Sequence, residues 1–452
     1  MLEDQLAAVQ AENDALRQQV LSLQEQLAAA LARIAELENR PKDPPAFVKP
    51  NRPTRERTPR RKRQPEHNRA RRLEPPTRVE QHVLDCCPDC GGRLHGGTLA
   101  RRRQVLELPP PQPVEVVEHQ VVKRWCAWCQ RWQMPHLDLT GQVVGQGRIG
   151  VRIASLIAYL RTTLRLPVRR IQAYLQTVHQ LSLSVGAIVE LLHQLRRALQ
   201  PALDQLKGQA RASPILHADE TGWRQAGQNG YIWSLSTPGP EAVRYYEYDA
   251  SRAGAVAVRL IGSDYRGHLV SDFYGGYNGL PGPHQRCWVH LLRDLNALVE
   301  KHGQDVWVRR WVVQVVAVYR LAQQRLGQAP ALTPAQRQAF CERLVERVAE
   351  LGRQYAQATG HVCQALAKRL LRHQSELFQF VRVEGLPADN NAAERSVRAV
   401  VIMRKISGGT QSAAGSQTRM GLASLFETWH ARGLNPFDEC LNLLRQTPLP
   451  QL

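Results

Sequence analysis

Between residues 214 and 290 the hydrophobic pattern changes from helical spacing to the spacing of short strands. The pattern predicts, in chain order, three strands, a helix and a fourth strand, at 214–219, 231–236, 243–248, about 252–262 and 268–270. Asp219 ends the first strand and Asp272 follows the fourth. If these strands are neighbours in one sheet, their ends bring two carboxylates close enough to share metal ions.

This order of elements is the one expected of a ribonuclease H-like core. A fifth strand is predicted at 285–289, where the chain enters a helix. The helical pattern then continues from 291 to 383 with Arg and Lys on its polar face, which is more than such a core needs. We interpret the excess as a helical insertion that covers the acidic site or grips a substrate. The alternative is a scaffold with solvated charges.

The charge of the chain indicates a polyanionic partner. The formal net charge is +20, and nucleic acid is the polyanion that fits best. No apolar run approaches the roughly 20 residues that span a bilayer and no signal peptide is evident, so we expect a cytoplasmic protein without membrane contact. On DNA it is expected to be associated with the nucleoid. A chain of 452 residues predicts two or three folded modules.

Residues 1–39 carry a heptad repeat without Gly or Pro. Its a positions are Leu6, Asn13, Val20, Leu27 and Ile34, and its d positions are Leu2, Val9, Leu16, Leu23, Ala30 and Leu37. Asn13 at an a position favours a parallel dimer in register, because each Asn13 can hydrogen-bond its own copy. The segment therefore predicts a coiled coil that forms a homodimer or a higher oligomer. The alternative is a single helix that packs on its own domain.

Residues 40–80 have the composition of a disordered linker, with nine Pro and fourteen Lys or Arg against five acidic residues. Its most basic run is Arg60, Arg61, Lys62 and Arg63. We interpret the linker as a cationic tether that attracts DNA phosphates, and the alternative is a solvated spacer.

Two CxxC pairs lie in the segment 81–140, which we expect to be a zinc-binding module: Cys87 with Cys90, and Cys126 with Cys129. Two such turns let four thiolates converge on one structural zinc ion, and the Pro-rich and Val-rich stretch between them can form a β ribbon. The alternative is a set of free buried thiols.

Residues 146–210 have a helical pattern, with helices near 151–164, 168–177 and 184–199. Their short connections suggest helix-turn-helix geometry. The third helix is mostly apolar and leaves few side chains to contact bases, so a packing role for this bundle is an equal alternative to DNA recognition.

Several motifs lie within and after the predicted core. They are Leu216-His-Ala-Asp-Glu-Thr-Gly-Trp223, Ser271-Asp-Phe-Tyr-Gly-Gly-Tyr277, Cys287-Trp-Val-His290, and Asp389-Asn-Asn-Ala-Ala-Glu-Arg-Ser-Val-Arg398, which continues through Lys405-Ile-Ser-Gly-Gly409. These segments resemble the transposases of the insertion sequence 66 family. The heptad repeat, the double CxxC module, the helical segment and the core also follow in the order that the family has them. The basic linker departs from the glycine-containing linkers usual in the family, so its role stays open.

The resemblance implies a DDE transposase, an enzyme that cuts and rejoins DNA with two Mg²⁺ or Mn²⁺ ions. It assigns the catalytic, metal-binding acids to Asp219, Asp272 and Glu394, and it suggests accessory proteins encoded by the same element. Three carboxylates suit these ions, which prefer oxygen ligands. Glu220 should point to the other face of a continuing strand and is a weaker candidate. Each acid alone could instead cap a turn or, for Glu394, pair with Arg398 in one helix.

The segment after Glu394 adds candidates for phosphate contact: Arg395, Arg398, Arg404 and Lys405. Cys287 and His290 form a CxxH pair without evident partners, which we interpret as a structural feature of the helix start.

We therefore expect a multidomain protein of the α+β and α/β classes, with a coiled coil, a zinc module, a helical bundle and a ribonuclease H-like core split by a helical insertion. The core is expected at 211–290 and 386–430, the insertion at 291–385 and a C-terminal segment at 431–452. Two other functions fit these features: a DNA-binding protein without catalysis, and a nuclease that hydrolyses DNA without joining its ends.

Overall fold

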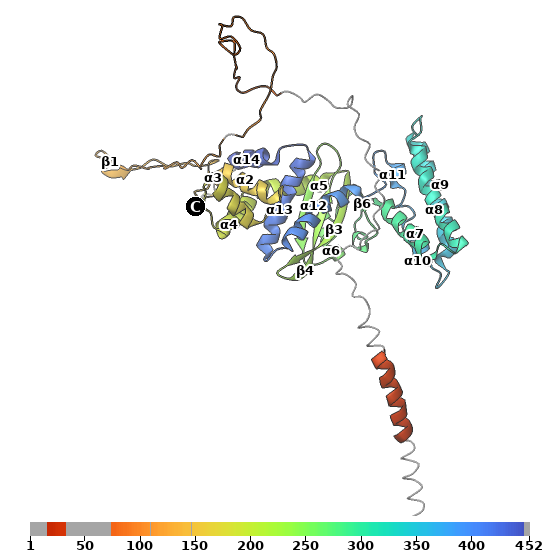
Figure 1. Cartoon of the computed structure of the whole chain (residues 1–452). Coiled ribbons are helices and arrows are strands. Elements are labelled where there is room, and N and C mark those ends of the chain that lie inside the picture. Colours follow the sequence, from red (N-terminus) through yellow and green to blue (C-terminus); the bar gives the residue numbers. More distant parts are fainter. Residues whose placement is uncertain (1–15, 33–73, 109, 146, 447–452) are drawn as a thin grey trace, which may run out of the picture. The chain divides into compact units, whose positions relative to one another are not determined.

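The computed structural model describes residues 16–32, 74–108, 110–145 and 147–446. The chain divides into two compact units, Met1–Leu108 and Pro109–Leu452. Figure 1 colours both from red at the N-terminus to blue at the C-terminus.

In the first unit, residues 16–32 form a helix. Four of its predicted a and d residues expose between 53% and 62% of their surface: Leu16, Val20, Leu23 and Leu27. Such a stripe on a lone helix is typical of a surface that a partner covers. The rest of 1–39, including Asn13, lies outside the described residues. So does the linker up to residue 73, with Arg60, Arg61, Lys62 and Arg63.

Four helices follow in the second unit: α2 (Val151–Thr162), α3 (Val168–His179), α4 (Val185–Ala198) and α5 (Gln200–Ala212). Local chemistry sets two of their starts. Pro167 precedes α3, and the Ser184 hydroxyl accepts a hydrogen bond from the backbone N–H of Ala187 at the start of α4. The three predicted helices are confirmed. The fourth, α5, was not separated from α4 because only Leu199 stands between them.

A five-stranded mixed sheet of order β5-β4-β3-β6-β7 follows these helices. Its strands are β3 (Ile215–Gln225), β4 (Gln228–Ser236), β5 (Arg244–Asp249), β6 (His268–Ser271) and β7 (His284–Arg286), with α6 (Gly254–Ile261) before β6. β4 pairs antiparallel with both β3 and β5, whereas β6 and β7 extend the sheet parallel to β3. The predicted strands and helix are therefore confirmed in number and order.

The prediction that the first strand ends at Asp219 was wrong, because β3 continues to Gln225. Its second half pairs with β4 across a turn at Ala226 and Gly227, whose φ angles of 50° and 78° suit a tight hairpin. Trp223 in this half is only 1% exposed. Burial of this large side chain holds the polar residues after Asp219 in the sheet. This burial depends on tertiary packing, which the alternation of hydrophobic residues in the sequence does not show.

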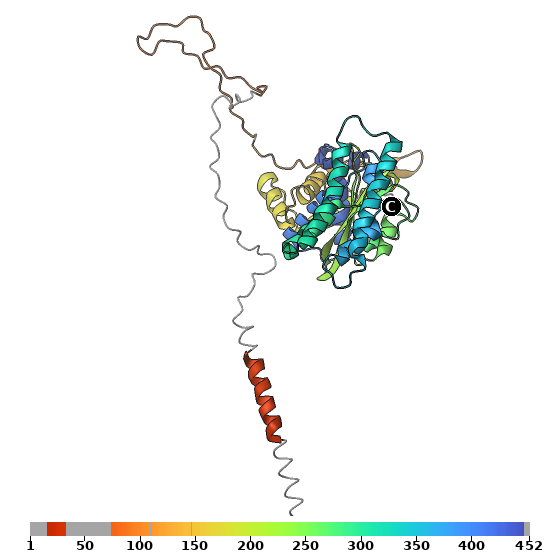
Figure 2. The same ribbon diagram turned by 90° about the vertical axis from the view of Figure 1, so that its right-hand side faces the viewer.

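Five helices then interrupt the sheet region: α7 (Trp288–His302), α8 (Val306–Leu326), α9 (Pro334–Ala356), α10 (Gln364–His373) and α11 (Gln379–Arg382). They surround a core of their own that includes Trp288, Trp311 and Phe378. Figure 2 shows the long, mutually contacting helices α8 and α9 facing the viewer. The helical pattern predicted for 291–383 is thus confirmed.

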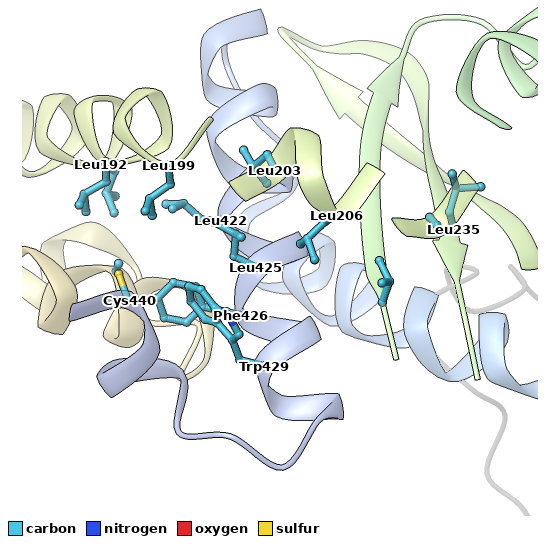
Figure 3. Close-up of a cluster of buried hydrophobic side chains, with 14 of the residues drawn as sticks. Leu192, Leu199, Leu203, Leu206, Leu235, Leu422, Leu425, Phe426, Trp429 and Cys440 are labelled. Carbon is cyan, nitrogen blue, oxygen red and sulfur yellow. The ribbon is translucent and has the colours of Figure 1, made fainter. Parts of the chain in front are cut away.

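The chain returns to the sheet with α12 (Asn391–Ser407), α13 (Ala413–Ala431) and α14 (Pro436–Gln446). α12 packs against β3 and β4, while α13 packs against β5 and against α2, α4 and α5. Figure 3 shows the core formed there, with Leu422, Leu425 and Phe426 of α13 among leucines of α4 and α5. Among the described residues, no helix combines the length and the apolar character needed to cross a membrane.

Two glycines end α12 and turn the chain onto the β3–β4 hairpin. At Gly409 the φ angle is 128°, and a Cβ atom there would lie 2.1 Å from the carbonyl oxygen of Arg224. The backbone N–H of Thr410 donates to that same carbonyl at 2.9 Å. Position 409 therefore requires glycine for both conformation and space.

We expect Gly409→Ala to lower the free energy of unfolding by about 3 kcal/mol, because unfavourable φ and contact with a backbone carbonyl act together. Gly408→Ala is the matched control. Its φ is 69° with nothing within 4 Å of the added carbon, so the expected loss is only about 1 kcal/mol. Urea unfolding followed by circular dichroism measures both changes, and equal losses would contradict this account.

Candidate active site

Asp219 and Asp272 lie at corresponding positions of two neighbouring strands. His217 of β3 is in parallel register with Val270 of β6, and each aspartate lies two residues beyond this pair. The parallel pairing of the two strands ends there, since β6 ends at Ser271. The structure thus brings the two acids to one edge of the parallel part of the sheet, as the sequence pattern predicts.

Glu394 reaches this edge from the first turn of α12. Asn390, which precedes the helix and is only 1% exposed, holds that turn in place. Its side-chain amide donates to the carbonyl of Ala218 at 2.8 Å, and its side-chain oxygen lies 3.0 Å from Nδ1 of His217. One buried amide therefore fastens the start of α12 to the strand that carries Asp219.

The neighbouring acids act electrostatically on Asp219. Burial is the main cause that raises the pKa of Asp219 to about 7, and the negative charges of Glu220, Asp272 and Glu394 contribute to the same shift. A hydrogen bond from the backbone N–H of Glu220 to Asp219, at 2.9 Å, opposes it. Such a partly buried cluster is unfavourable when ionised unless a cation accompanies it.

Glu220 has partners of its own. Its side chain is 2% exposed and accepts hydrogen bonds from Arg252 at 2.9 and 2.6 Å and from the Tyr277 hydroxyl at 2.6 Å. The Arg252 guanidinium also lies over the ring of Tyr274, 4.1 Å from its centroid. These contacts occupy both carboxylate oxygens of Glu220, which makes it a poorer metal ligand than a carboxylate without such partners.

Arg286 fixes the backbone at Asp272, a role that the sequence analysis missed. The Arg286 side chain is 1% exposed and donates to the Asp272 carbonyl at 2.9 Å and to Glu376 at 2.6 Å. The backbone N–H of Tyr274 donates to the Asp272 carboxylate at 2.9 Å. Arg286 therefore links the loop that carries Asp272 to the helical insertion.

His290 lies beside Glu394, a contact that the sequence analysis also missed. Its Nδ1 atom is 3.7 Å from Oε1 of Glu394, and both atoms are buried without a hydrogen-bond partner in the part of the chain that the structure describes. Glu394 forms no ion pair with Arg398 in those residues. The sequence signal was the Cys287-Trp-Val-His290 spacing, which places His290 in the first turn of α7.

The basic residues after Glu394 have different surroundings. Three are exposed on α12: Arg395, Arg398 and Lys405. Arg404 instead donates hydrogen bonds to the carbonyl of Gly222 and to the hydroxyl of Thr221, both on β3. Its position supports packing of α12 on the sheet, whereas the other three can meet phosphate groups.

Comparison with known proteins identifies the family. The model of the transposase IS66 family matches residues 146–418, which is more than half of the chain. The chain belongs to the IS66 transposase family. The matched residues include all three acids, the helices α2 to α5 and the helical insertion, so the elements described above are those of an IS66-family transposase.

A second match, to the zinc-finger binding domain of IS66 transposases, covers residues 85–130 and both CxxC pairs. Backbone hydrogen bonds from Asp89 and Cys90 lower the pKa of the Cys87 thiol, and a backbone hydrogen bond from Cys129 does the same for Cys126. The second pair joins two antiparallel strands, β1 (Arg124–Cys126) and β2 (Arg131–Gln133). Turns that favour thiolates suit a structural zinc ion, and the family match supports one.

Two relatives of this IS66-family chain come from Sinorhizobium fredii (strain NBRC 101917 / NGR234). The uncharacterized protein y4jD is 24% identical over 394 residues, which are 80% of the chain and 74% of the relative. The uncharacterized protein y4jO is 30% identical over 168 residues, which are 37% of the chain and 49% of the relative. The match therefore spans about half of y4jO and most of y4jD.

Replacing Asp219 with Asn is expected to stabilise the metal-free protein at pH 8. The carboxyl group keeps its proton up to about pH 7 in the fold, whereas its ordinary pKa is 3.8. The protonated carboxyl group of Asp219 therefore contributes fully to the free energy of unfolding below about pH 4. This contribution is lost as the pH rises through 7. Asn carries no charge at any pH, so the variant should gain about 1 to 3 kcal/mol at pH 8 and nothing at pH 4.

Urea unfolding in the presence of a chelator measures this difference at both pH values. Asp264→Asn, at an exposed position, is the matched control and should change stability little at either pH. A gain for Asp219→Asn that is the same at pH 4 and pH 8 would contradict the burial of a charge-sensitive carboxyl group at this site.

Proposed function

We propose that this protein cuts DNA at the ends of an insertion sequence and joins them to a target, using metal ions held by Asp219, Asp272 and Glu394. The observation that carries the proposal is that the negative charges of Asp272, after β6, and Glu394, on α12, raise the pKa of Asp219 on β3, in a member of a transposase family. The sheet order β5-β4-β3-β6-β7 supports a ribonuclease H-like core, because its first and fourth strands are neighbours.

The three acids fit a pair of Mg²⁺ or Mn²⁺ ions, which prefer carboxylate oxygens. Burial and neighbouring negative charges hold the pKa of Asp219 near 7, and Oε1 of Glu394 is buried without a hydrogen-bond partner among the described residues. A cation relieves both conditions. When bound, two such ions activate the attacking water or hydroxyl and stabilise the leaving oxygen.

Other residues would position these acids and the DNA. Asn390 and Arg286 hold the backbone beside the acids. Arg395, Arg398 and Lys405 are exposed on the helix that carries Glu394, where they would bind the phosphates on either side of the cut. The helical insertion reaches the site through His290 and Glu376, which supports the interpretation that it covers the site or grips the end DNA.

The cysteine module would bind one structural zinc ion through Cys87, Cys90, Cys126 and Cys129. The zinc-finger match across 85–130 and the thiolate-favouring turns support this set. The basic linker that precedes it in the sequence, with Arg60, Arg61, Lys62 and Arg63, would act as a cationic tether for DNA.

The N-terminal helix would join two chains in a parallel coiled coil. The exposed apolar residues at 16–32 and the heptad pattern around them support this assembly. Two active sites in one assembly suit a reaction that must hold both ends of a DNA element. Accessory proteins of the same element remain part of the proposal because the family resemblance suggests them.

Replacing Asp272 with Asn should lower DNA cleavage and strand transfer by at least about 100-fold, because the change keeps the shape but removes a charge that holds the metal pair. Asp219→Asn and Glu394→Gln should behave alike. DNA affinity should stay near normal, since Lys and Arg supply it. The measurement is a Mg²⁺-dependent assay with candidate end sequences, combined with salt-dependent binding.

Asp264→Asn is the control and should keep cleavage within about tenfold. Retention of near-normal cleavage by a folded variant of any of the three acids would remove that residue from the site. The same assay separates the alternatives: a nuclease gives cut DNA without joined products, and a DNA-binding protein gives neither.

A cysteine placed directly before Leu2 should crosslink rapidly to its copy in a second chain, because a parallel coiled coil brings the two N-termini together. Non-reducing gel electrophoresis of the full chain measures the product. A cysteine at Asp264, far from the helix in the sequence, is the control and should crosslink slowly. A monomer at micromolar concentration, or crosslinking before Leu2 that is no faster than at position 264, would contradict the parallel dimer.

A further inference from the structure

The contact between His290 and Glu394 has the features of an incomplete ion site. The 3.7 Å between Nδ1 and Oε1 is too long for a hydrogen bond. Both atoms are nevertheless buried without a hydrogen-bond partner in the described residues, although each side chain keeps about 30% of its surface exposed, with values of 28% and 31%. Two orphaned polar atoms that face each other at this distance indicate a third group between them.

A divalent cation fits that space. Ligand atoms that share a first-row ion at about 2.1 Å lie roughly 3 to 3.5 Å from each other. A separation of 3.7 Å therefore needs a shift of only a few tenths of an ångström. Among the described residues, one group of three possible metal ligands has all its ligand atoms within 4.8 Å of one another. It consists of Cys287, His290 and Glu394.

Cys287 already has another role in this group. It precedes α7, and its sulfur accepts a hydrogen bond from the backbone N–H of Asn390 at 3.2 Å. Cys287 therefore holds the starts of α7 and α12 together, which leaves His290 and Glu394 as the two side chains available to an ion.

We propose that His290 is a nitrogen ligand of the metal ion that Glu394 binds. This inference rests on the proposed function, because it adds a ligand to the same ion. An imidazole ligand makes the site softer than three carboxylates alone, so His290 would raise the affinity for Mn²⁺ more than that for Mg²⁺. A metal ligand at His290 also explains why the helical insertion starts beside the acids, since α7 carries His290.

The test is electron spin echo envelope modulation of Mn²⁺ bound to the full, zinc-loaded chain, in which histidine is labelled with ¹⁵N. The wild-type chain should show coupling of Mn²⁺ to a histidine nitrogen. His290→Gln should lose the coupling and weaken Mn²⁺ binding by about tenfold or more, while Mg²⁺ affinity falls less. His290→Asp replaces nitrogen with oxygen and should bind Mn²⁺ without the coupling.

Two controls locate the nitrogen. His302→Gln changes an exposed histidine at the other end of α7 and should keep the coupling, as should Cys287→Ser. Bound Mn²⁺ without histidine coupling in the wild-type chain would overturn the role of His290 and leave the proposed function intact. Failure of Glu394→Gln to weaken Mn²⁺ binding would overturn both.

Discussion

Asn390 joins three segments that are far apart in the sequence through its side chain and its backbone N–H, and the arrangement of the site depends on it. Burial lowers the pKa of His217 to about 4, so its ring is neutral at pH 7 and can donate from Nδ1 to the Asn390 oxygen. The Asn390 amide then donates to the carbonyl of Ala218, and its backbone N–H donates to Cys287. These contacts place β3, α7 and α12 together, and an unpaired buried amide would be costly.

This arrangement is stable only because other interactions offset the repulsion between acids. The pKa of Asp219 near 7 shows that the fold holds a carboxylate where burial and other negative charges disfavour it. Arg286 and Arg252 neutralise neighbouring carboxylates, but neither is placed on Asp219 or Glu394. The fold therefore keeps part of the site unneutralised, which is the condition that favours cation binding and that costs stability when no cation is bound.

The sequence predicted the parts of the site that depend on local pattern. The acids Asp219 and Asp272 follow strand signals, and the sheet register brings them together as expected. Glu394 was predicted only through the family resemblance, because the helical insertion separates it from the strands. His290 was interpreted as structural, and Arg404 was predicted to contact DNA, although it binds β3. Their neighbours come from distant segments, and no local periodicity shows such tertiary contacts.

For the helical insertion too, the sequence predicted the local structure but not the tertiary contacts. Its helices are evident from spacing, but two of its connections to the site are side-chain contacts, one through Arg286 with Glu376 and one through His290 with Glu394. Anomalous diffraction from crystals of the full chain soaked in Mn²⁺ can show whether Asp219, Asp272 and Glu394 form one metal-binding cluster. We expect manganese peaks within coordination distance of all three carboxylates. Peaks that leave any one of the three uncoordinated would show that they do not form a single cluster.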